Sequence, residues 1–159
     1  MRKKLICVMA YVFLTVKLGF LSSLSIGQSG DELAILVPGG GDYSRSIGSD
    51  SEMAQQFFDQ GLRMAWGFYF PESIASYQEA SRLDPQNPMP YWGIAHAAGP
   101  NPNSRYVNLP DDPQGAGLAA IRKALDLANN GTQLERDLIS ATFVLYNKDA
   151  IPDNRERDF

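Results

Sequence analysis

Cysteine and histidine are almost absent from this chain of 159 residues, which contains one of each. Cys7 has no second cysteine to pair with, so an intrachain disulfide and a cysteine metal cluster are excluded. His96 alone cannot supply a histidine-based metal site of the usual composition. No hydroxyl, thiol or amine stands out as an activated nucleophile. The sequence therefore predicts no catalytic residues, no metal ligands and no cofactor, and we expect a protein that is not an enzyme.

Basic residues are also scarce, with 14 Lys and Arg against 18 Asp and Glu and a net charge of −4. Four of the basic residues, Arg2, Lys3, Lys4 and Lys17, lie at the start of the chain. A chain cleaved after residue 27 keeps 10 basic residues against 18 acidic ones, a net charge of −8. Such a surface repels phosphate backbones, so nucleic acid is excluded as the expected partner.

Residues 1–27 have the layout of a signal peptide: a basic start, an apolar run and small residues before Gln28. Cleavage near Gly27 predicts an exported protein, periplasmic or secreted. An uncleaved membrane anchor is the alternative, because the apolar stretch approaches the roughly 20 residues that span a bilayer. Lys17 lies inside that stretch and disfavours a stable span. A membrane contact is expected only through this leader.

Residues 28–50 mix polar and small residues and include PGGGD at 38–42. The segment has no helical periodicity and is too short to form a core of its own, which predicts a flexible linker. Its glycine cluster lacks the Lys-Ser/Thr ending of a P-loop, so it does not indicate nucleotide binding.

A partial internal repeat follows, in which AQQFFDQGLRMAWGFYFPESIASYQEASRLDP is succeeded by NPMPYWGIAHAAG. Phe57 and Tyr91 are 34 residues apart, which is the period of a tetratricopeptide unit. We expect Gly61 and Ser73 to let two antiparallel helices approach closely, and Phe57 and Tyr77 to fill the space between them. Gln60 stands where the pattern has Leu, so Gln60→Leu is expected to be neutral or stabilising.

Through the strings AQQFFDQGL, SYQEASRLDP and YWGIAHAAGPN the chain resembles tetratricopeptide-repeat (TPR) proteins, and more narrowly a group of exported bacterial ones. The resemblance covers about residues 39–148 and is specific over 53–100. It implies stacked antiparallel helical hairpins, a short α-solenoid, and chains that are longer than this one.

The apolar periodicity predicts an all-α domain over 51–148 with a loop inserted at 99–113 and a charged tail at 149–159, where the chain looks truncated. We expect the first helix to be capped by Asp50 or Ser51, an αL cap at Asn130-Gly131, and a capping box of Thr132 and Glu135. The five helices are expected near 52–67, 71–83, 88–98, 114–129 and 132–147.

As the resemblance implies, one face of each first helix lines a concave groove that binds a protein or peptide segment. Matching that face onto this sequence selects six residues: Gln55, Phe58, Leu62, Met89, Trp92 and His96. Trp92 and His96 are one turn apart and should point the same way. The alternative for this face is that the 99–113 loop or a third repeat covers it. The alternative function is a docking or stabilising front end of a larger enzyme or metal-dependent protein, with its catalytic part beyond Phe159.

Overall fold

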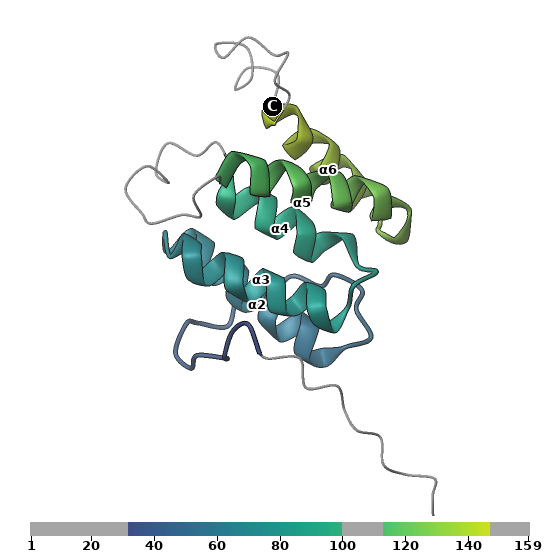
Figure 1. Cartoon of the computed structure of the whole chain (residues 1–159). Coiled ribbons are helices and arrows are strands. Elements are labelled where there is room, and N and C mark those ends of the chain that lie inside the picture. The colour runs from purple at the N-terminus through teal and green to yellow at the C-terminus, as the bar shows by residue number, and fades with distance from the viewer. Residues whose placement is uncertain (1–31, 100–112, 147–159) are drawn as a thin grey trace, which may run out of the picture. The chain divides into compact units, whose positions relative to one another are not determined.

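The computed structural model describes residues 32–99 and 113–146, and all regular structure within these ranges is helical. The predicted all-α class is therefore confirmed, and each helix begins and ends within two residues of its expected bounds. The expected signal peptide, the charged tail and all but the ends of the inserted loop lie outside the described residues. The helices are α2 (Glu52–Trp66), α3 (Phe70–Leu83), α4 (Pro88–Ala98), α5 (Pro113–Leu127) and α6 (Gln133–Leu145), with a 3-10 turn η2 (Ala128–Asn130) before α6 (Figure 1).

The helix starts follow the predicted capping chemistry. The Ser51 hydroxyl accepts a hydrogen bond from the Ala54 N–H at 3.2 Å, and Thr132 and Glu135 form the complete capping box of α6. The αL cap at Gly131 was a wrong prediction, because its φ of −96° and ψ of 171° are extended. Since Thr132 must cap the next helix at once, the chain leaves η2 extended instead of turning back through αL.

Tyr77 of α3 packs against small residues of two neighbouring helices. A Cβ added to Gly61 of α2 would lie 2.6 Å from the Tyr77 ring, and one added to Gly93 of α4 would lie 2.5 Å from it. The Ser73 hydroxyl donates to the Gly61 carbonyl at 2.7 Å, which also requires α2 and α3 to lie close together. The expected close approach at Gly61 and Ser73 is confirmed, and it is Tyr77 that occupies the space.

Two hydrogen bonds join α4 to α6. The Trp92 Nε1–H donates to the Thr142 hydroxyl at 2.8 Å, and the Tyr146 hydroxyl donates to the Ala95 carbonyl. Trp92, Thr142 and Tyr146 are all buried, so these bonds lie within the core that α4, α5 and α6 share.

The helices pack mainly against their neighbours in the chain. Each of the pairs α2/α3, α3/α4, α4/α5 and α5/α6 is in contact, and the alternate pairs α2/α4 and α4/α6 also touch. Figure 1 shows α2 to α5 side by side in this order, followed by α6. The α2/α4 and α4/α6 contacts bring the first helix of each predicted hairpin against the first helix of the next hairpin.

The segment 32–50 differs from the flexible linker that was expected. Ile47 is only 4% exposed and belongs to the same hydrophobic core as the helices. Main-chain atoms of this segment, called the lead-in below, are hydrogen-bonded to side chains of α2, of α3 and of Asn87, the N-cap of α4. The lead-in is therefore part of the folded domain.

Candidate functional site

A row of polar side chains on α2 holds the lead-in. The row consists of Gln55, Asp59, Gln60 and Arg63, of which Asp59 and Gln60 are buried, at 6% and 3% exposure. Residues four apart on a helix lie on one face, so Gln55, Asp59 and Arg63 are aligned along the helix and Gln60 lies beside them. Burying a polar side chain is costly unless its hydrogen bonds are made. We call these four residues the α2 polar row.

Gln60 binds the first half of the lead-in through both ends of its amide. Its Nε2 donates to the Ile35 carbonyl at 2.9 Å, and its Oε1 accepts from the Val37 N–H at 2.7 Å. The same Nε2 also donates to the Ser76 hydroxyl of α3 at 3.0 Å. A buried glutamine amide is thereby satisfied largely by main chain from outside its own helix.

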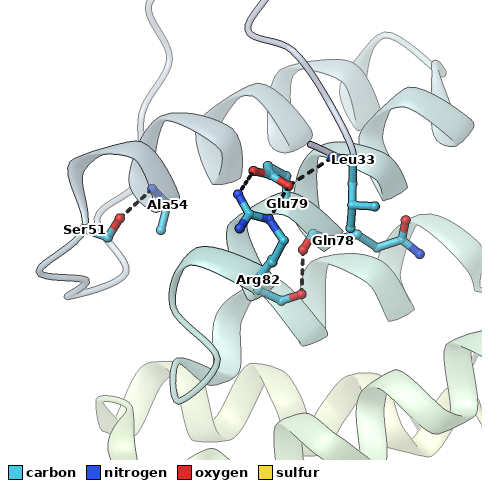
Figure 2. A network of polar contacts seen from close by, with 7 residues as sticks. Leu33, Ser51, Ala54, Gln78, Glu79 and Arg82 are labelled. Carbon is cyan, nitrogen blue, oxygen red and sulfur yellow. Dashed lines mark hydrogen bonds and ion pairs between the residues drawn. The ribbon is translucent and has the colours of Figure 1, made fainter. Parts of the chain in front are cut away.

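Glu79 of α3 holds the start of the lead-in. One of its oxygens accepts from the Leu33 N–H at 3.1 Å, and both oxygens accept from the Arg82 guanidinium. Figure 2 shows the Glu79 carboxylate between Arg82 and the Leu33 main chain. The Arg82 hydrogen bond is the main cause that lowers the pKa of Glu79, so this carboxylate is ionised at neutral pH.

Asp59 and Gln55 bind the second half of the lead-in. Asp59 accepts from the Ser44 hydroxyl at 2.7 Å and from the Arg45 N–H at 2.9 Å. Gln55 accepts from the Ile47 N–H at 3.0 Å, and its Nε2 donates to the Arg45 carbonyl at 2.8 Å and to Asp59 at 3.0 Å. Gln55 and Asp59 thus bind the same short stretch of main chain, from Arg45 to Ile47.

Two further side chains also bind the main chain of the lead-in. The Arg63 guanidinium donates to the Tyr43 carbonyl at 2.9 Å, and the Asn87 side chain donates to the Ile47 carbonyl at 2.8 Å. With one exception, the Ser44 hydroxyl, these contacts are made to main-chain atoms of the lead-in. An arrangement of this kind recognises the backbone of a peptide and places few demands on its side chains.

A pocket of about 320 Å³ adjoins the row, where the lead-in meets the corner between α2 and α3. Trp66, Phe68 and Tyr69 at this corner are exposed, and Phe68 has a φ of +65°. Positive φ is unfavourable for a bulky residue, so the corner holds an aromatic side chain at solvent at some conformational cost. The lining residues are Val37, Pro38, Gly39, Gly40, Gln60, Arg63, Met64, Gly67, Tyr69 and Glu72.

Four of the six residues predicted to line a groove are core residues: Phe58, Leu62, Met89 and Trp92. Phe58 packs against Tyr77 with ring centroids 5.4 Å apart, and Leu62 and Met89 are buried in the same core. Their expected place on an open surface was wrong, because the close approach of the helices turns them inward. Gln55 is half-buried and belongs to the α2 polar row.

Trp92 and His96 do point the same way, as predicted, with stacked rings 5.2 Å apart at an angle of 7°. Trp92 is nevertheless buried, and the Arg45 guanidinium lies 6.0 Å from the centre of its ring. His96 keeps exposed surface, but its neighbours partly desolvate its imidazole and thereby lower the pKa from its ordinary value. The lead-in therefore touches two of the predicted groove residues, Gln55 and Trp92.

Sequence reasoning missed Asp59, Gln60 and Arg63. The one available signal was Gln60, a polar residue at a position where the repeat pattern has a buried Leu. A buried amide needs partners, so the position indicated a segment to be bound and not a defect in the repeat.

Comparison of the chain with known protein families, curated proteins and solved structures gave no match. None of the described helices is both long and apolar enough to cross a bilayer. Within residues 32–99 and 113–146, no three His, Cys, Asp or Glu side chains are grouped so that they could hold a metal ion.

Proposed function

We propose that this chain is an exported interaction module of the TPR class, which binds an extended segment of a protein or peptide partner on its helical surface. The observation that supports this proposal best is that side chains of the α2 polar row bind the main chain of the lead-in. There, Gln55, Asp59 and Gln60 bind five main-chain groups of residues 35–47. A surface that already holds one polypeptide backbone has the donors and acceptors to hold another.

The helical arrangement supports the repeat class. Packing between chain neighbours, with further contacts between alternate helices, is the pattern expected of stacked helical hairpins. The 34-residue offset between Phe57 and Tyr91 gives the same period in the sequence. Export is proposed from the leader layout of residues 1–27 alone.

The exposed aromatic corner supports a macromolecular partner over a small molecule. Tyr69 lines the pocket beside the row, and Trp66 and Phe68 are exposed at the same corner between α2 and α3. Exposed aromatic side chains are the type that most often dominates the energetics of protein interfaces. The row would align a partner's main chain, and the corner would contact its side chains.

A displayed library of short random peptides tests this function on the full chain. Because the lead-in covers part of α2, the library is panned against the wild-type chain and against a Leu33→Pro/Val37→Pro variant, which lacks two of the N–H donors that hold the lead-in. We expect enriched peptides whose binding is weakened several-fold by Arg63→Ala in the row. Arg122→Ala on the exposed face of α5 is the matched control and should leave binding unchanged. Failure to enrich any peptide on either protein would refute the proposed function.

A further inference from the structure

The two halves of the lead-in are held very differently. The second half is anchored by Ile47, whose side chain lies in the core. In the first half, Leu33, Ile35 and Val37 have side chains that are 51%, 70% and 49% exposed. These three residues therefore keep about half or more of their surface in water, and their hydrophobic contribution to holding the segment is smaller per residue than that of Ile47.

Hydrogen bonds to alternate residues hold this first half. Leu33 and Val37 donate their N–H groups to Glu79 and Gln60, and Ile35 accepts at its carbonyl. Contacts at every second residue are typical of an extended strand, in which successive side chains point to opposite sides. Between them, Ala34 packs partly against the core, whereas Leu36 is 38% exposed.

The turn between the two halves gives the first half freedom to separate. Gly39 and Gly41 have φ values of +90° and +87°, and a Cβ at either would meet nothing within 4 Å. Glycine loses more conformational entropy on folding than any other residue, so this turn opposes closure of the first half. Release of residues 33–37 would also remove Val37 from the wall of the 320 Å³ pocket.

We propose that residues 33–37 are a displaceable pseudo-ligand, and that the partner is an extended peptide segment that takes their place on Gln60 and Glu79. This inference rests on the proposed function and names its ligand. The main chain of the segment makes the contacts: one N–H donates to Glu79, one C=O accepts from Gln60, and a second N–H donates to Gln60. It carries a small residue at the position of Ala34 and tolerates most residues at the exposed positions.

The test uses the full chain and a fluorescein-labelled peptide of residues 31–42 supplied in trans. In the Leu33→Pro/Val37→Pro variant two donors are lost, while the affected side chains are exposed, so the helices should stay folded. Ile35→Pro is the matched control, because Ile35 contributes its carbonyl and not its N–H. Limited proteolysis within residues 33–37 reports whether the segment is released, because the two amides that its hydrogen bonds would protect from exchange are absent from the proline variant. Fluorescence anisotropy reports peptide binding.

We expect the peptide to bind the double variant about ten-fold or more tightly than the wild type or the Ile35→Pro control, because occupancy in cis lowers the apparent affinity by the free fraction. A second pair of peptides tests the contact from the ligand side. Methylation of the Val37 nitrogen removes the donor to Gln60 and should abolish binding, whereas methylation of the Ile35 nitrogen should not.

Three results would overturn the proposal. One is equal binding to wild type and double variant although proteolysis shows that the segment is released. Another is equal binding of the two methylated peptides. The third is a double variant whose segment stays protected, which would mean that side chains hold it. If any of these occurs while library peptides still bind the variant elsewhere, the pseudo-ligand is refuted and the interaction function stands.

Discussion

Tyr77 sets the distance between three helices, because its ring fills the space that Gly61 and Gly93 leave open. The Tyr77 hydroxyl is buried without a hydrogen-bond partner among the described residues, and burial raises its pKa. The ring, and not the hydroxyl, is therefore the part that the packing uses. The sequence alone indicated the close approach at Gly61 and Ser73, but not that the same ring also contacts Gly93 of α4.

Gly61→Ala should destabilise the chain by about 1 to 3 kcal/mol, because the new Cβ would overlap a ring held rigidly in the core. Gly40→Ala is the control, since its Cβ would lie 3.5 Å from the side chain of Arg63 and can be accommodated. Urea unfolding followed by circular dichroism measures both. Equal midpoints for the two variants would contradict this account of the packing.

The contacts of Gln60 argue against the expectation that Gln60→Leu is neutral or stabilising. Its amide makes hydrogen bonds to Ile35, Val37 and Ser76. We now expect Gln60→Leu to lower the free energy of unfolding by about 1 to 3 kcal/mol, since polar groups are left without partners. Gln56→Leu, which removes only an exposed contact with Glu52, should change it by less than about 0.5 kcal/mol. A Gln60→Leu protein as stable as wild type would show that water replaces the amide without loss.

At the scale of elements, the helices could be predicted and the lead-in could not. Helix bounds follow from local signals, such as the Ser51 cap, the Thr132 capping box and apolar residues at helical spacing. The lead-in is fixed by side chains up to 46 residues away that bind its main chain. Main-chain recognition leaves no periodic pattern in the bound segment, so a glycine-rich stretch looked like a linker.

The Glu79 anchor should make the fold of this segment sensitive to acid. Its pKa is lowered in the folded chain, so its contribution to stability is present above the ordinary value of 4.5 and is lost as pH falls through the folded value. We expect the wild type to exceed Glu79→Gln in melting temperature at pH 7, with the difference shrinking steadily below pH 4.5. If the difference in melting temperature between the two proteins stayed constant from pH 7 to pH 3, this role of Glu79 would be ruled out.

At the scale of the whole molecule, the 34-residue offset was visible in the sequence, but the burial of the predicted groove residues was not. The 34-residue offset selected Phe58 and Trp92 as equivalent positions. In the structure Phe58 packs against Tyr77, while Trp92 bonds to Thr142 and lies beside Arg45. These two positions, 34 residues apart, have different neighbours, and here the lead-in and α6 supply those of Trp92.

Trp92 therefore connects the lead-in, α4 and α6, and its removal should affect all three. We expect Trp92→Ala to cost about 3 to 5 kcal/mol, the range for deleting a large buried aromatic side chain. Amide exchange should quicken in α6 as well as in α4, because Thr142 loses its donor and Arg45 loses the ring beside it. Leu134→Ala on α6, at a side chain 64% exposed, is the control and should change neither quantity. If Trp92→Ala left stability and α6 exchange unchanged while reducing peptide binding, Trp92 would be a surface contact for the partner, and the core assignment would be wrong.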